Sequence, residues 1–584
     1  MVKTQSKKSL SPKFLALGVL LSLFLAGCQQ SADKVAGRMV SDKGVNIENL
    51  LPGDLLFVAK VGTADQGQIN LFKELTGYFP NDPVVALITE FNKGFKEGAK
   101  FDEVGLDYEK DILPILSERS MVVFAAAGNS NGSEKPKLYL AMTVADQAKM
   151  DSLLNKQLEK GLLSKDKYAD FDYYSEKSNT DQPAYFARTQ DVLFVTNSLD
   201  EMKKSLDSLK AGKSTLADNK LYQQMNAKNP TSLGFLYADL PGTLNFLKNS
   251  GQETDEFKQA ITAFAQTESY EKLAGELIVL SAEKNGLRFS TYLSAKDGQD
   301  LKDLMGEKTY LAKEIPAGDT LMYVESANFK KAFKQFFDTL AKDPANGNPE
   351  QEMKTALAAA GFDYEKDILA MLEKGFALVI EDSGSVIPSM GVYVDVSGNI
   401  EAAGRVATIM DKSIDGMLLE AKTQSPEAEM LLKKEVVEAG KLWKLKFNLD
   451  ALLVGAPEEI GKKLTGQKIE FYYGILKGKM MVLALKPDLE KVYGQGKSVA
   501  DGEEYKFAQK SLGNADVGMF YISPEQSFIY IDRLMKLAAS AGAPLDTTEY
   551  DKVKSSMMPI KSLSGSSKME GQMFLSQIFI HIGN

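Results

Sequence analysis

The chain has 584 residues, of which 44% are hydrophobic and 25% are charged, which is the composition of a soluble globular protein. This length exceeds what one ordinary hydrophobic core holds, so two domains are expected. The formal net charge of −10 argues against nucleic acid as a partner. A single cysteine and a single histidine leave little for disulfides, zinc sites or nucleophilic catalysis.

The first 27 residues predict a lipoprotein signal peptide. A segment with four lysines precedes an apolar run over residues 14–25, which is the pattern of a secretory signal and is too short for a comfortable transmembrane span. The run ends in Leu25-Ala26-Gly27-Cys28, which resembles a bacterial lipobox. The resemblance implies cleavage before Cys28 and lipidation of that cysteine by acyl chains such as palmitate. Residues 28–47 are then the lipidated cysteine and its tether.

This leader predicts an exported protein, lipid-anchored to a bacterial membrane through Cys28. Gln29 follows the cysteine in place of an aspartate, which favours the outer membrane, facing the periplasm, if the host has two membranes. Cleavage removes four lysines and no acidic residue, so the net charge changes from −10 to −14. A charge of this sign argues against anionic lipid headgroups as partners.

A seven-residue segment, Asp107–Leu113, recurs unchanged as Asp363–Leu369. Its pattern predicts a short capped helix with one apolar face. A proline follows the first copy and an alanine the second, so a backbone donor is not needed there, which favours Asp111 and Asp367 as the caps. The structural interpretation is preferred to one in which these acids are ligands or acid–base groups.

The recurrence predicts two tandem repeats, unit 1 over residues 48–298 and unit 2 over 313–584, joined by a linker over 299–312. Each begins with a proline-glycine turn and an apolar strand, and continues through helix, two strands, helix, further strands, helix and a closing hairpin. The predicted strands of unit 1 are 55–59, 121–127, 137–144, 185–188, 192–196, 275–280 and 287–293. Those of unit 2 are 320–324, 376–381, 391–396, 471–476, 480–484, 569–575 and 578–582.

This order of elements predicts an α+β fold, in which each repeat is a mostly antiparallel sheet with helices packed on one face. The opening turn, the segment Asp107–Pro114 and the strand pair after it resemble an exported bacterial family known only as a domain of unknown function, DUF3352. The resemblance covers nearly all of the mature chain, in two copies. It implies no catalytic residues, because that family has no established activity.

Two short motifs match catalytic patterns in residue type and spacing but lack the structural context that those patterns need. Gly128–Gly132 has the spacing of a hydrolase nucleophile elbow, but a loop follows its serine and the chain has no histidine nearby to serve as the base. Gly212–Thr215 resembles the end of a phosphate loop, but a helix precedes it in place of a strand, which predicts a helix C-cap.

No cofactor and no metal site are predicted. His581 is the only histidine, and it is expected on a strand facing solvent or a neighbouring strand. Asp297–Asp300 lacks the other ligands of a calcium loop and is expected to be a linker turn. Trp443, the only tryptophan, is expected on a strand over 442–447 and to pack on the sheet, with ligand stacking as the alternative.

These observations favour a non-enzymatic, lipid-anchored envelope protein that binds a partner protein, a hydrophobic ligand or another envelope component. A cleft between the repeats is the default location for such a site. One alternative is a carrier of a lipid or other hydrophobic ligand, whose cavity 23 methionines and 30 phenylalanines are available to line. The other is a carboxylate-based hydrolase of envelope glycans, which two acids facing each other in a polar cleft would favour.

Overall fold

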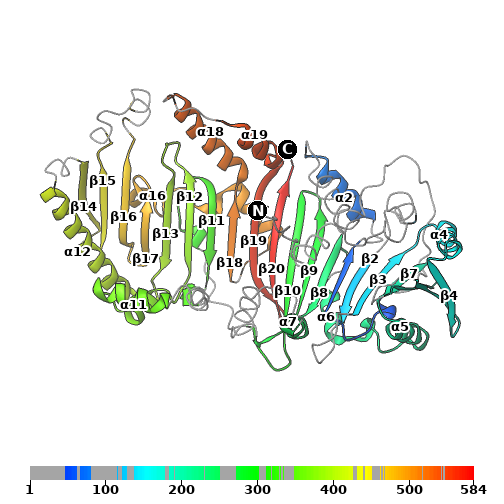
Figure 1. Ribbon diagram of the computed structural model, residues 1–584. Helices are drawn as coiled ribbons and strands as arrows, with labels where there is room; N and C mark the ends of the chain where they lie inside the picture. The colour runs from blue at the N-terminus through cyan, green and yellow to red at the C-terminus, as the bar shows by residue number, and fades with distance from the viewer. Residues whose placement is uncertain are drawn as a thin grey trace, which may run out of the picture. The chain divides into compact units, whose positions relative to one another are not determined.

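The computed structural model describes most of the chain after residue 46 (Figure 1). Within 47–584 it leaves out 62–65, 80–114, 116–121, 128–136, 178–182, 190, 229–230, 250–270, 302–310, 317, 328, 331–332, 335–347, 425–430, 439–440, 450–460, 462–464, 466, 514, 516, 541, 543–545 and 584. Three predicted features lie outside the described residues, namely Cys28, Asp107–Leu113 and Gly128–Gly132. The chain divides into two compact units, Met1–Gln299 (unit 1) and Asp300–Asn584 (unit 2).

Unit 1 contains an antiparallel sheet with the strand order β10-β9-β8-β1-β2-β3-β7-β6-β5-β4. Its strands are β1 (Phe57–Val61), β2 (Val122–Ala127), β3 (Lys137–Thr143), β4 (Leu163–Tyr168), β5 (Phe171–Glu176), β6 (Tyr185–Thr189), β7 (Val192–Thr196), β8 (Gly234–Asp239), β9 (Leu273–Glu283) and β10 (Gly286–Ala295). Its helices are η1 (Ile47–Leu50), α2 (Gln66–Thr76), α4 (Gln147–Glu159), α5 (Leu199–Ala211), η4 (Leu216–Asp218), α6 (Lys220–Asn226) and α7 (Leu240–Asn249).

Unit 2 contains an antiparallel sheet with the strand order β20-β19-β18-β11-β12-β13-β17-β16-β15-β14. Its strands are β11 (Asp319–Ser326), β12 (Phe376–Asp382), β13 (Ser389–Asp395), β14 (Leu432–Glu438), β15 (Leu442–Phe447), β16 (Ile469–Leu476), β17 (Met480–Leu485), β18 (Gly518–Ile522), β19 (Ile560–Glu570) and β20 (Met573–Ile582). Its helices are η6 (Leu311–Lys313), α11 (Pro349–Ala359), η8 (Tyr364–Leu369), α12 (Ile400–Gln424), α16 (Leu489–Val492), η9 (Val499–Asp501), α17 (Glu503–Leu512), α18 (Pro524–Ser540) and α19 (Thr548–Met557).

Mixed helices and antiparallel sheet in both units confirm the α+β class. The strand order of unit 2 is that of unit 1, strand for strand, in the same sequence along the chain. Five strands were not predicted, namely β4, β5, β8, β14 and β18. The closing hairpin of unit 2 was predicted too late in the chain, because its turn lies at 571–572, between β19 and β20.

The prediction that helices pack on one face of each sheet is wrong. In unit 2 the consecutive residues Tyr472 and Tyr473 of β16 point to opposite faces, and both are fully buried. Tyr472 belongs to a core with Leu489 of α16 and Ala508 of α17, whereas Tyr473 belongs to a second core with α12. Figure 1 shows α12 and α18 on the viewer's side of this sheet. Helices therefore lie on both sides of this sheet, and β16 is apolar on both sides because each side of it packs against helices.

Unit 1 has the same two-sided arrangement. On one face, Met142 and Leu193 pack against Met150 and Leu154 of α4. On the other face, the hydroxyl of Tyr139 in β3 donates a 2.9 Å hydrogen bond to Glu201 of α5. Local capping fixes where the helices begin, since the Asp146 side chain accepts from the backbone amide of Lys149 at the start of α4.

Candidate functional site

The second copy of the repeated segment forms the short helix η8, as the sequence predicts, but the cap is a different aspartate. Asp363 accepts hydrogen bonds from the amides of Glu365 and Lys366, at 3.0 and 2.9 Å. Asp367, the predicted cap, is buried and instead accepts from the Asp363 amide at 2.8 Å and from Arg405 of α12 at 2.6 Å. Both acids are thus engaged in holding the helix, which supports the structural interpretation of this copy.

Two other predicted features have structural roles. Gly212 is the C-cap of α5 in the left-handed conformation, with φ of 62°, and its amide donates to the carbonyl of Ser208. This confirms the helix C-cap at Gly212–Thr215. Trp443 is buried in β15 and stacks on Tyr473 at 5.5 Å between ring centroids, which confirms its use in packing.

His581 does not face solvent. Its ring stacks on Phe507 of α17 at 4.0 Å between centroids, and its Nδ1 atom lies 3.6 Å from a carboxylate oxygen of Glu504. The predicted strand position was right, but a helix covers that side of β20. Among the described residues, no group of three or more histidine, cysteine or acidic side chains lies close enough to hold a metal ion.

A cluster of ionisable groups lies where α16 meets β15 and β16. The hydroxyl of Tyr472 contacts two carboxylates, Glu470 at 2.9 Å and Glu490. Lys444 donates to the other oxygen of Glu490 at 2.9 Å, and the amide of Asp488 donates to Glu470 at 2.7 Å. Burial, followed by the hydrogen bonds with Glu490 and Glu470, raises the pKa of Tyr472 well above its ordinary value.

This cluster does not have the electrostatics of a glycosidase acid. Such an acid needs a raised pKa so that it stays protonated. Burial alone would raise the pKa of Glu490, but hydrogen bonds from Tyr472 and Lys444 outweigh burial and lower it. Glu470 is itself buried. The cluster therefore fastens α16 to the sheet and presents no acid–base pair to a substrate.

A different feature of unit 2 is exposed to solvent, and no motif in the sequence marks its residues. Six apolar side chains lie together on the α12 side of four adjacent interior strands, β16, β17, β13 and β12. Strand pairing places them in two rows, with Phe471, Leu485, Met390 and Ile380 in one and Leu483 and Val392 in the other. We call this set the apolar face; it consists of Ile380, Met390, Val392, Phe471, Leu483 and Leu485.

Solvent reaches the apolar face. Met390 is 44% exposed and Leu483 is 37% exposed, and the other four side chains are partly buried. The solvent-facing side of an antiparallel sheet normally alternates to polar residues, so an apolar row on interior strands is a departure from that rule. Exposed apolar groups of this kind mark interaction sites.

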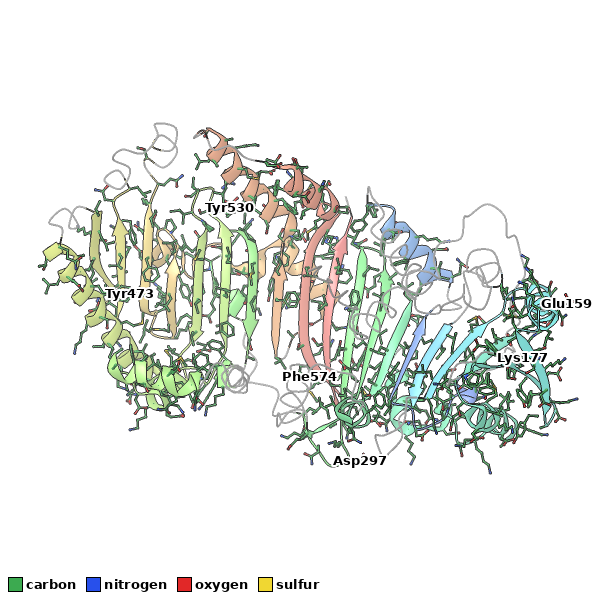
Figure 2. All side chains as sticks on the ribbon, in the orientation of Figure 1. Glu159, Lys177, Asp297, Tyr473, Tyr530 and Phe574 are labelled. Carbon is green, nitrogen blue, oxygen red and sulfur yellow. The ribbon has the colours of Figure 1, made fainter. Side chains whose placement is uncertain are left out.

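The apolar face lies between two helices that pack on the same sheet. α12 packs on β16, and α18 packs on β11 and β19. Figure 2 labels Tyr473, on the part of the sheet that α12 covers, and Tyr530, on α18, and the apolar face occupies the strands between them. At the α18 end, the hydroxyl of Tyr530 donates a 2.7 Å hydrogen bond to the carbonyl of Val386. Arg533 forms a bidentate ion pair with Asp382, with both hydrogen bonds at 2.6 Å. Arg533 and Asp382 are therefore paired with each other at this end.

Sequence periodicity carries a partial signal for this face. Residues 469–476 and 480–485 read as almost continuous apolar runs, which predict strands buried on both sides. An apolar run does not indicate which face of the strand a helix covers, or how many residues of that face the helix covers. Only the placement of α12 and α18 leaves these six side chains open.

Fold and site together define an α+β protein whose second antiparallel sheet carries a solvent-exposed apolar face between two helices. The chain belongs to the family described as "Protein of unknown function (DUF3352)", whose model matches residues 88–575. No curated protein matches the chain. Among the described residues, none of the helices combines the length and apolar character that crossing a membrane requires.

The chain is similar to solved structures of TP0453. Crystal form IV is 11% identical, with a TM-score of 0.23 over 43% of this chain and 81% of that chain. Crystal form I is 11% identical, with a TM-score of 0.23 over 44% and 82%. Crystal form III is 10% identical, with a TM-score of 0.22 over 45% and 88%. Scores of this size carry no argument about function.

Proposed function

We propose that this protein is a non-enzymatic binding protein of the bacterial envelope, anchored by lipid on Cys28, and that it binds its partner through the apolar face. The observation that carries the proposal is the exposure of Met390 and Leu483 on interior strands, where a sheet that faces only water would carry polar side chains. The lipobox-like Leu25–Cys28 supports the anchor and the envelope location.

We further infer that the two units are copies of one ancestral unit. The common strand order supports this, as does the identity of Asp107–Leu113 and Asp363–Leu369. Matching irregular details add support, because they have no reason to recur by chance. An isolated bridge joins Pro52 to Thr215 in unit 1, and another joins Pro316 to Ser498 in unit 2.

The residues after each bridge match as well. Thr215 forms a capping box with Asp218, and Ser498 forms one with Asp501. The next helix of each unit brings a tyrosine edge-on to a tyrosine of the central strands. Tyr222 meets Tyr237 of β8 at 5.3 Å and 85°, and Tyr505 meets Tyr323 of β11 at 5.6 Å and 83°. Because β11 corresponds to β1 and not to β8, the match lies in the helix tyrosines alone.

A photo-crosslinking experiment tests the binding role. A benzophenone amino acid replaces Met390 in the full chain, which is expressed in a bacterial host and irradiated in intact cells. The matched control replaces Val553, which is 50% exposed on α19 and lies outside the apolar face. We expect adducts from position 390, with either a protein or a lipid as mass spectrometry resolves it, and none of the same mass from position 553.

The absence of adducts from position 390, or the same adducts from both positions, would contradict the proposal. Labelling in intact cells keeps the anchor and any natural partner in place. The comparison of positions 390 and 553 therefore separates binding at the apolar face from non-specific association of the chain.

A further inference from the structure

We propose that the apolar face takes one acyl chain of a single-chain lipid, with the lipid headgroup left in solvent. This inference rests on the proposed function and names the ligand of the same site.

The strands under the apolar face offer no backbone groups to a ligand. Each of β16, β17, β13 and β12 pairs with a strand on both sides, so its amides and carbonyls are used within the sheet. An extended peptide gains its affinity by adding a strand to a free sheet edge, and none exists here. The occupant must therefore bind through apolar contact alone.

The area of the face is small for a protein partner. Six side-chain positions, each taking about 4.8 Å across the strands and 6.8 Å along them, give roughly 200 Å². A specific protein–protein interface buries about 800 Å² on each partner. A second copy of the chain or another folded protein would need about four times the apolar face, so a smaller occupant fits better.

The open strip is wide enough for an acyl chain. Three strands separate β16, against which α12 packs, from β11, the nearer of the two strands against which α18 packs. The centres of β16 and β11 are thus about 19 Å apart. One extended acyl chain is thinner than this strip.

The charge of the site also suits a neutral chain. All six side chains of the apolar face are uncharged. At the α18 end Asp382 is paired with Arg533, and Asp319, which lies opposite Asp382, adds a further negative charge beside Arg533. The hydrogen bonds from Arg533 lower the pKa of Asp382, so the pair stays ionised and closed on itself at neutral pH. Nothing at that end calls for a charged headgroup, which fits a ligand held by its chain.

The single tryptophan provides a direct readout. Trp443 pairs with Tyr473, and Tyr473 pairs with Leu483, so Trp443 lies on the same side of the sheet two strands from the apolar face, about 10 Å away. The probe is cis-parinaric acid, a polyene fatty acid that accepts excitation energy from tryptophan. Full-length protein, held in an amphipathic polymer in place of detergent, is titrated with it.

We expect parinaric acid to quench the emission of Trp443 and to saturate. We expect Leu483→Glu and Met390→Glu each to weaken the binding at least tenfold, and Val553→Glu to leave it unchanged. Two separate variants guard against misfolding, and Met390, being the more exposed, is the safer site for a charge. Thermal unfolding of each variant verifies its fold.

Absence of energy transfer in the wild type, or transfer that survives both glutamate substitutions, would overturn the inference. The crosslinking experiment separates this failure from failure of the proposed function. Protein adducts from position 390 without parinarate binding would refute the acyl ligand and leave the binding role standing. Loss of both signals would refute both.

Discussion

At the scale of single residues, Gly474 allows β16 to pack closely against β15, because it has no side chain. Its φ of 118° lies in a region that other residues rarely adopt. A Cβ atom there would overlap the carbonyl oxygen of Lys441 and lie 3.1 Å from the ring of Trp443. We expect Gly474→Ala to lower the free energy of unfolding by about 3 kcal/mol, because backbone strain and overpacking add. Urea unfolding followed by Trp443 fluorescence measures this change.

Gly416 is the matched control. It lies inside α12, and a Cβ atom there would meet no other atom within 4 Å. Gly416→Ala is expected to raise the stability by up to about 1 kcal/mol, since alanine is the better helix former. A loss at Gly416 as large as that at Gly474 would contradict the explanation by backbone geometry.

The repeated segment shows the limit of sequence reasoning at this scale. A capped helix over Asp363–Leu369 follows from the pattern and is present. Which aspartate serves as the cap depends on Arg405, which is 38 positions away in the chain and draws the Asp367 side chain into an ion pair. Local preferences are similar for the two aspartates, so the tertiary contact made the choice.

At the scale of elements, the ion pair between Arg533 and Asp382 fastens α18 to the end of β12. The Asp382 side chain is only 4% exposed, and Arg533 bonds both of its oxygens at 2.6 Å. We expect Arg533→Met to lower the free energy of unfolding at pH 7 by about 3 kcal/mol, because it leaves a buried carboxylate without its partner. Lys536→Met, an exposed position on the same helix, is the control and is expected to change little.

The same pair predicts a pH dependence of known sign. Arg533 lowers the pKa of Asp382 in the folded protein. This stabilisation is present in full above the unfolded pKa of about 3.9 and is lost as the pH falls through the lower folded value. The stability difference between wild type and Arg533→Met should therefore shrink below about pH 4. A difference that stays constant between pH 7 and pH 3 would refute this account.

The strands β4 and β5 were not predicted because their sequences lack the pattern of a half-buried strand. β4 carries Lys165, Asp166 and Lys167 in succession, which lacks the alternation expected of a half-buried strand. Its neighbour β5 contributes Tyr173 and Tyr174, which point to opposite faces and are both buried. The hairpin exists because its partner strand and the helices hold it, and not because of its own pattern.

At the scale of the whole molecule, the predicted anchor leads to a simple test. The full chain is expressed in a bacterial host that is fed alkyne-labelled palmitate. We expect the label on the wild type and on Gln29→Ala, and its complete loss in Cys28→Ser, since Cys28 is the only cysteine. Label that persists in Cys28→Ser would show that the lipobox interpretation is wrong.

The sequence by itself determined the α+β class, most strands of both units and the family, because turns, apolar strands and an exact seven-residue recurrence are local properties of a chain. It also located the helix C-cap at Gly212 and the packing role of Trp443. Which parts of the two sheet faces the helices cover was determined only by the tertiary structure. Apolar periodicity records that a side chain prefers burial, but the positions of α12 and α18 determine which side chains are left open, and those positions depend on contacts far apart in the chain.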